Sequence, residues 1–501
     1  MLIVIRSCLV AVLILIGAYG TQAQDVLRVG VTSFPTSRGN PFNTTTGSPS
    51  SYTYSAFLEG LTRVNKNAEP VPALAERWEH ETETSWLFHM RPGAVFSNGE
   101  PADAHAVAAT FAMLRTGIGL TYPITRELDG IVSITAIDDA TARIVTDAPN
   151  ILLPSKMAGM NIVPPRYWAD VGPDGFAAAP VGSGPYMIET WGVAEIDLVR
   201  SPSSWRQPKI ERVKLITGPE PVARVQGVLS GNLDIGLQLG PDEIPQVEAA
   251  GHTMAVALDS SMQVLAFVTV KESPLQDIRV RRALNYAVNR DVIEQVLLSG
   301  YMPMASQTAP RNAFGYNPDL EVWPYDPEKA RELLGEAGYS DGFSLTAEIL
   351  LQSATFSAPV YQQVAADLAR VGVRLEIRRI PASQYSRGVY QGEWAGATFG
   401  IDYGTNPTLD ALQPLVRHSC LWTVPWFCEP SILPLIEKAK SAFDIDERQR
   451  LTQEVMRVQR DLVPGIFLYE TTRFDALNRR VKGYEIAVGK INYDQITLNG
   501  D

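Results

Sequence analysis

Residues 86–101 read WLFHMRPGAVFSNGEP, and the pattern around this stretch decides the class of fold. Residues 85–91 are typical of a strand, which the following Pro-Gly pair ends. A tight turn at 97–99 comes next, and Asp103 can then cap a helix whose apolar stripe lies within 107–114. A strand and a helix in such close succession indicate a chain that mixes both kinds of element.

The same mixture continues in both directions along the chain. Strands are predicted at 26–31, 131–137, 141–146, 213–217, 234–237, 264–270, 373–377 and 466–469. Helices are predicted at 50–61, 222–229, 361–371, 433–443 and 447–461. A Pro- and Gly-rich stretch from 164 to 185 predicts a domain boundary. We therefore expect an α/β fold, or an α+β fold with mixed sheets.

Two helices in the second half are strongly marked. Apolar residues at three- and four-residue spacing over 280–297 predict one continuous helix that Gly300 ends. Asp326 precedes Pro327 and predicts the capped start of another helix, which closes at Gly338. Both apolar stripes predict core packing, and neither indicates a cofactor.

The composition is that of a globular protein with several domains. The chain has 501 residues, of which 45% are hydrophobic and 20% are charged. Its net charge of −12 disfavours a nucleic-acid partner, because phosphate backbones attract basic surfaces. A mean hydropathy of −0.03 excludes a membrane protein with many spans.

The first residues are typical of an export signal. Arg6 precedes an apolar run over 9–16, and small residues up to Ala23 offer a cleavage site. The alternative is a membrane anchor, but the apolar run is shorter than the roughly 20 residues that a spanning helix needs. We therefore expect residues 1–23 to be removed near Ala23 and the mature protein to reside in the periplasm. A Cys does not follow the cleavage site, so a lipoprotein is not expected.

The cysteines predict one local bridge. Cys8 lies within the export signal, which leaves Cys420 and Cys428 in the mature chain. Because an exported protein meets an oxidising compartment, we expect a disulfide between them. The alternatives are two buried thiols or a metal site with His418, and a closed zinc site takes four ligands rather than three.

Common catalytic signatures are not expected in this chain, and these include the G-x-S-x-G nucleophile elbow. The S-x-x-K, H-E-x-x-H, Walker and G-x-G-x-x-G patterns are not found, and the five histidines are scattered along the sequence. Because a catalytic triad can assemble from distant positions, this does not exclude an enzyme. It favours a non-enzymatic protein without catalytic residues, metal or cofactor.

Seven ordered segments carry a resemblance to a known family. They are 57–61 (FLEGL), 72–78 (PALAERW), 86–101, 181–186 (VGSGPY), 231–235 (GNLDI), 282–290 (RALNYAVNR) and 326–339. In order and spacing they resemble the family 5 solute-binding proteins of peptide, opine and nickel ABC importers, the oligopeptide/dipeptide-binding type. The resemblance covers nearly the whole mature chain.

The resemblance implies a class II periplasmic-binding-protein fold with two lobes, an additional domain and mixed sheets. The implied parts are lobe I at 25–54, 180–266 and 470–501, the extra domain at 55–179, and lobe II at 267–469. Two crossovers near 267 and 470 would form the hinge. A ligand that touches both lobes favours their closure.

The implied function is capture without chemistry. A short peptide or related amino-acid-derived solute would bind between the lobes and pass to an ABC permease and ATPase at the inner membrane. A monomer is the simplest expectation for such a diffusing receptor. Other interpretations stay open: a sugar, metal chelate or haem as ligand, a periplasmic hydrolase, and a chaperone or signalling receptor that reuses the fold.

One anchor for the ligand follows from the resemblance. Residues 400–403 (GIDY), followed by 406–408 (NPT), resemble the family segment A-D-Y-x-x-P-T, in which the aspartate of peptide binders pairs with the ligand's α-ammonium group. Asp402 is thus the expected anchor, because a buried carboxylate needs a cationic partner. There are two departures: an extra residue precedes Pro407, and Phe399 lies where the family has a Trp. The alternative is a structural Asp that caps a turn.

Further site residues are expected around the same segment. Arg387 is a candidate for binding a ligand carboxylate, with a surface Arg as the alternative. His418 is a weaker candidate for a nickel or haem contact. Aromatic residues that can stack on a ligand, or else belong to the core, are Trp394, Phe399, Tyr403 and Trp422.

Overall fold

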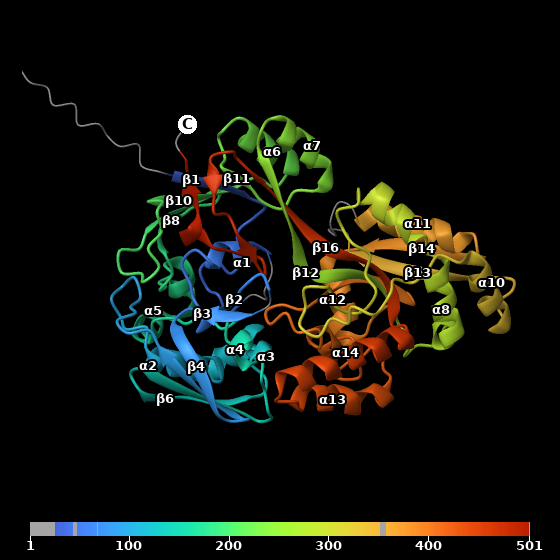
Figure 1. Ribbon diagram of the computed structural model, residues 1–501, viewed down its shortest axis with the longest axis horizontal. Helices are drawn as coiled ribbons and strands as arrows, with labels where there is room; N and C mark the ends of the chain where they lie inside the picture. The colour runs from blue at the N-terminus through green and yellow to red at the C-terminus, as the bar shows by residue number, and fades with distance from the viewer. Residues whose placement is uncertain (1–25, 44–47, 68, 351–356, 500–501) are drawn as a thin grey trace, which may run out of the picture.

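The computed structural model describes residues 26–43, 48–67, 69–350 and 357–499 (Figure 1). The predicted export signal at 1–23, with Cys8, lies outside these residues. Within them, no helix has the length and apolar character that crossing a membrane requires.

A ten-stranded mixed sheet forms the centre of the molecule. Its strand order is β14-β13-β15-β12-β16-β11-β1-β10-β9-β8. The two long strands β12 (Thr253–Phe267) and β16 (Gly465–Leu477) pair antiparallel in its middle. Figure 1 shows both running between the half that holds β1 and the half that holds β13. Both strands are longer than the predicted 264–270 and 466–469.

The remaining strands of this sheet lie on either side of the long pair. On one side are β15 (Thr398–Gly404), β13 (Phe343–Leu350) and β14 (Val373–Ile380). On the other are β11 (Ile235–Gly236), β1 (Val26–Val31), β10 (Arg212–Thr217), β9 (Glu195–Arg200) and β8 (Tyr186–Trp191). The predicted strands at 26–31 and 213–217 are confirmed.

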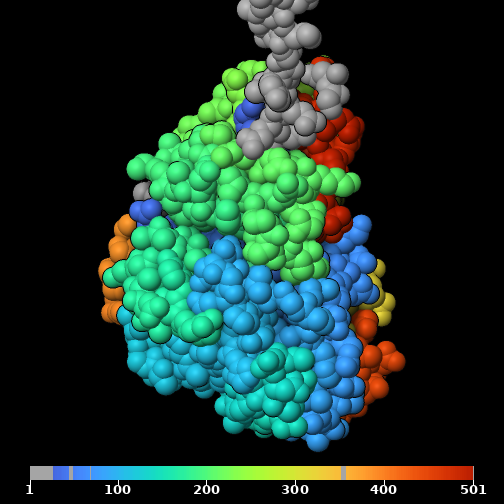
Figure 2. All heavy atoms as spheres, turned by 90° about the vertical axis from the view of Figure 1, so that its left-hand side faces the viewer, coloured from blue at the N-terminus to red at the C-terminus, as the bar shows by residue number. Residues whose placement is uncertain are grey.

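A separate four-stranded antiparallel sheet contains the segment that opened the sequence. Its order is β4 (Ala75–Thr82), β5 (Ser85–Met90), β7 (Thr141–Thr146) and β6 (Ile131–Asp138). Helix α2 (Ala104–Leu114) packs on it, and the Asp103 carboxylate accepts a hydrogen bond from the Ala106 amide at 3.0 Å. The predicted cap is therefore confirmed. Figure 2 shows this region, blue to cyan, below the green surface of the neighbouring part.

The other helices connect and cover the sheets. Their bounds are α1 Ser48–Tyr54, α3 Ile124–Glu127, α4 Leu153–Lys156, α5 Pro165–Ala178, α6 Pro221–Leu229, α7 Ile244–Ala249, α10 Pro327–Glu336, α11 Ser357–Ala369, α12 Ala382–Gln391, α13 Leu433–Ser441 and α14 Ile445–Leu462. Helix α1 ends at Tyr54, earlier than the predicted 61. The proline-rich stretch at 164–185 contains the helix α5. The predicted Asp326 cap is confirmed, since its carboxylate accepts from the Lys329 amide at 2.8 Å.

The single helix predicted over 280–297 is wrong. Helix α8 (Ile278–Ala287) ends before an extended Val288, and α9 (Arg290–Val292) starts afresh after Asn289. The Asn289 side chain accepts from the Val292 amide at 3.2 Å and so caps the new start. The buried Arg290 guanidinium donates to the carbonyls of Asn285 and Phe467, which hydrogen bonds inside one straight helix would not provide.

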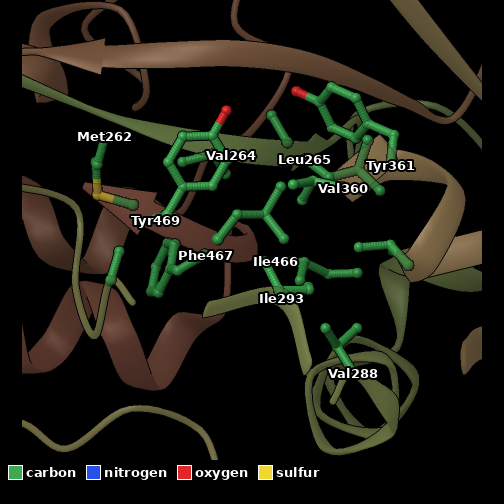
Figure 3. Close-up of a cluster of buried hydrophobic side chains, with 14 of the residues drawn as sticks. Met262, Val264, Leu265, Val288, Ile293, Val360, Tyr361, Ile466, Phe467 and Tyr469 are labelled. Carbon is green, nitrogen blue, oxygen red and sulfur yellow. The ribbon is translucent and has the colours of Figure 1, made fainter. Parts of the chain in front are cut away.

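Three large hydrophobic clusters form the core. One surrounds the long strands and continues under α8 and α11 (Figure 3). The second lies between the four-stranded sheet and α2, and the third surrounds β1 and β10. The division into lobe I, extra domain and lobe II at the stated bounds stays a prediction.

Candidate functional site

A cavity of about 1050 Å³ lies between the segment 126–156 and the segment 402–448. The middle of β12, at 259–261, also lines it. Two long-range contacts bring its sides together. The Gln413 amide donates to the Glu127 carboxylate at 3.2 Å, and the Phe443 ring lies 4.9 Å from the ring of His80. These two contacts join the opposite sides of the cavity.

Asp402 lines the cavity because of its register on β15. Successive side chains of a strand point to opposite faces of the sheet. Phe399 and Tyr403 therefore enter the core, each 0% exposed, while Asp402 faces the cavity. Gln263 lies opposite Asp402 on the neighbouring strand β12.

Asp402 is exposed toward the cavity, although the surrounding protein still desolvates its carboxylate. The pKa of Asp402 is raised from 3.8 to about 6, chiefly by burial and also by the Asp259 carboxylate, while a hydrogen bond with Gln263 opposes the rise. Within the described part of the chain, no Lys or Arg forms an ion pair with Asp402. The site thus holds an acid whose ionised form lacks a cationic partner, and a bound cation would supply one.

Arg417 brings a guanidinium group to the same cavity. Its side chain is exposed there, 5.7 Å from the Trp422 ring, and no carboxylate among the described residues pairs with it. The predicted Cys420–Cys428 disulfide is confirmed and closes the loop that follows Arg417. The sequence reasoning missed Arg417, although its position beside a bridged loop and a Trp was a usable signal.

Arg387 lies outside the cavity. It belongs to α12, its side chain is 50% exposed, and its guanidinium pairs with Glu393 at 3.2 Å. Neither the cavity nor the adjoining space behind Asp402 is lined by Arg387. Arg417, by contrast, lines both of these spaces together with Asp402.

The four predicted aromatic residues separate into two groups. Trp394 is buried and stacks on Phe399 with ring centroids 3.8 Å apart, so both belong to the core together with Tyr403. Trp422 alone among these four lines the cavity, and its indole N–H donates to the Val389 carbonyl at 2.8 Å. That bond fixes the ring against α12.

His418 also lines the cavity but is largely buried. Its ring stacks on Tyr403 at 3.5 Å between centroids, and burial holds its pKa well below 6.5, so it is neutral. Its Nδ1 has no hydrogen-bond partner among the described residues. Nowhere in the described ranges do three or more His, Cys, Asp or Glu side chains gather as a metal site would require.

The expectation that G-x-S-x-G does not occur is wrong, since this spacing is found at 338–342, around Ser340. The nucleophile elbow with this spacing turns from a strand into a helix. Here the segment follows helix α10 and precedes strand β13, which is the reverse order. Ser340 also lies outside the cavity lining. The spacing therefore gives no support to a hydrolase.

Comparison with known proteins agrees with this geometry. The model of the bacterial extracellular solute-binding proteins, family 5 (middle part), matches residues 69–420. The glutathione-binding protein GsiB of Shigella flexneri serotype 5b is 29% identical over 461 residues, 86% of each chain. The haem-binding protein A of Haemophilus influenzae is 25% identical over 446 residues, 82% of this chain and 81% of that protein.

A solved structure shows the same fold. The periplasmic binding protein DppA of Helicobacter pylori, in complex with the peptide STSA, superposes with a TM-score of 0.79 at 22% identity and covers 95% of this chain and 98% of its own. The predicted two-lobed α/β fold is thereby confirmed. Since the family match spans most of the sequence, this chain belongs to the bacterial extracellular solute-binding proteins, family 5.

Proposed function

We propose that this protein captures a short peptide, or a related solute derived from amino acids, in the cavity around Asp402. The observation that supports this proposal is the Asp402 carboxylate, which faces the main cavity without a cationic partner among the described residues. Relatives named for glutathione and for dipeptides support this class of ligand.

A zwitterion fits the charges that line the cavity. Its ammonium group would pair with Asp402 and relieve the cost of that buried charge. Its carboxylate would accept hydrogen bonds from the planar guanidinium of Arg417, whose donors match carboxylate geometry. Because segments 126–156 and 402–448 both line the cavity, a ligand held there favours the closed state.

Delivery completes the proposal. The closed, loaded protein would dock on an ABC permease with its ATPase at the inner membrane and release the solute there. The protein would act as a monomer in the periplasm, after removal of residues 1–23. Binding and transfer need no covalent step.

Calorimetric titration tests the ligand class. Ala-Ala should bind the stripped protein, and N-acetyl-Ala-Ala, which lacks the ammonium charge, should bind about 10- to 100-fold more weakly. Asp402→Asn should remove this preference. Asp147→Asn is the matched control, because Asp147 lines the same cavity and the charge change is identical. Equal binding of both peptides to the unaltered protein would contradict the ammonium anchor.

A metal chelate or haem is the second candidate, favoured by His418. Its unpartnered Nδ1 belongs to a neutral ring that lines the cavity, and neutral imidazole is a common metal ligand. Such a ligand would give an absorption band that changes in His418→Gln. Mass spectrometry of the solute that copurifies with the protein separates the two candidates.

A further inference from the structure

A small pocket lies where distant parts of the chain meet, and it is called here the basic pocket. It measures about 70 Å³. Its lining includes residues from 50–63, from 159–161 and from 490–492, together with Arg206. It shares only Ser51 with the lining of the main cavity of about 1050 Å³. The basic pocket is therefore a separate space that borders the main cavity at one residue.

Positive charge exceeds negative charge in the basic pocket. Its lining holds three cationic side chains, Arg63, Arg206 and Lys490, and one carboxylate, that of Glu59. The Glu59 carboxylate lies 3.6 Å from the Arg206 guanidinium, which also donates to the Asp494 carboxylate. Both carboxylates thus pair with the same guanidinium. Three cations and two carboxylates leave one positive charge in excess.

The other two cations form no ion pair within the part of the chain that the structure describes. The Arg63 guanidinium donates to the side-chain oxygen of Asn492 at 3.3 Å, and the Lys490 ammonium donates to the Ala158 carbonyl at 2.8 Å. Both acceptors are neutral. The Nε atoms of Arg63 and Arg206 are buried and have no hydrogen-bond partner among the described residues. A buried charge without a counterion is costly, so these cations lack the group that would stabilise them.

The cations also act on one another. The pKa of Lys490 is lowered from 10.5 to about 8, chiefly by burial and also by Arg63 and Arg206. Burial and the nearby Arg206 likewise lower the pKa of Arg63. An opposite charge within about 4–6 Å favours the charged form of such groups and would reverse both changes. At neutral pH Lys490 is still mainly protonated, so the excess of positive charge is present where the protein works.

We propose that the basic pocket binds a small monovalent inorganic anion between Arg63 and Lys490. One such anion balances the one charge in excess. A cavity holds a water molecule once about 10–15 Å³ is open to it, so about 70 Å³ suits a small ion with a few waters. Pockets for whole organic ligands measure about 300–1,000 Å³, which excludes a peptide here. The inference goes beyond the proposed function and does not depend on it.

The anion would hold the C-terminal segment in place. Lys490 begins the short strand β19 (Lys490–Ile491), and the Ile491 amide donates to the Ser55 hydroxyl at 3.3 Å. Figure 1 shows this red segment beside α1. Arg63 belongs to β2 (Thr62–Val64), far from Lys490 in sequence. Because like charges from the two segments repel, an anion between them stabilises their contact.

Bromide tests the site directly in the unaltered protein. It carries the same charge as chloride, has a similar size and scatters X-rays anomalously. Crystals of the stripped protein soaked in sodium bromide should show an anomalous peak that contacts the Arg63 guanidinium and the Lys490 ammonium. A basic pocket without a bromide peak would overturn the inference.

A charge substitution gives an independent test in solution. Replacing about 0.2 M sodium gluconate, whose anion is too large for the pocket, by the same concentration of sodium chloride should raise the Tm of the stripped protein by about 2 °C. Lys490→Met should lose this rise. In gluconate, Lys490→Met should be at least as stable as the unaltered protein, because it removes a buried charge that lacks a counterion.

Lys482→Met is the matched control. Lys482 is exposed in the same C-terminal segment and does not line the basic pocket, and the charge change is identical. This variant should keep the full rise in Tm with chloride. An equal rise in Lys490→Met, or its loss in Lys482→Met, would show that chloride acts elsewhere on the protein and would contradict the proposed site.

Discussion

Replacing Asp402 by Asn should stabilise the ligand-free protein. The pKa of Asp402 is raised from 3.8 to about 6 by burial, so folding favours its protonated form. The difference between these values corresponds to about 3 kcal/mol at neutral pH. Because Asp402 is exposed toward the cavity, solvent screening reduces the expected effect to about 1 kcal/mol.

The sign of the pH dependence follows from proton binding. Between pH 4 and pH 6 the folded protein holds more protons at Asp402 than the unfolded chain, so this group lowers stability as pH rises. The penalty is complete above pH 6 and falls to about a fifth at pH 4. The Asp402→Asn variant carries no such penalty at any pH, because an amide does not ionise in this range.

Scanning calorimetry of stripped protein measures the difference. For a chain of this length, about 1 kcal/mol corresponds to a rise in Tm of about 1 °C. Asp402→Asn should show that rise at pH 7.5 and lose most of it at pH 4. Asp147→Asn, on the same cavity, is the control for loss of one charge. A lower Tm at pH 7.5, or the same rise at both pH values, would refute the reasoning.

Two further substitutions check the cavity and its closure. Arg417→Gln should weaken the binding of Ala-Ala about tenfold, and the variant should no longer bind Ala-Ala more tightly than its C-terminally amidated form. Arg387→Gln should change neither affinity. Calorimetric titration of both variants decides which guanidinium binds the ligand carboxylate. Phe443→Ala removes ring contacts with His80 and Trp86 that are worth about 1 kcal/mol. The ligand-bound protein should therefore have a larger radius in small-angle scattering, and Ala-Ala should bind about fivefold more weakly. Phe443→Leu should retain most of the closure. An unchanged scattering profile for Phe443→Ala would show that this contact does not hold the closed state.

Local signals in the sequence predicted local structure well. The caps at Asp103 and Asp326 were read correctly, because a side chain and the amide it caps lie within one turn. The helix over 280–297 failed, because its break depends on Arg290 reaching carbonyls such as that of Phe467, which is distant in sequence. The length of β12 was missed for the same reason, since its first half is formed by pairing with β16.

The candidate site shows the same division. Asp402 was predicted from a short segment, and strand alternation places it on the cavity face. That same alternation carries Phe399 and Tyr403 into the core, which the residue types alone did not reveal. Arg417 was not predicted as a cavity residue, because the cavity is lined by segments that meet only after folding.

The amino-acid order by itself therefore determined the family, the mixed α/β class and the disulfide pair, since each depends on residues close together or on an ordered series of short segments. Tertiary structure alone decided which charged groups line the cavity together and how much space the cavity holds. The physical reason is that charge pairing and cavity shape depend on distances between segments that are hundreds of residues apart, and those distances exist only in the packed molecule.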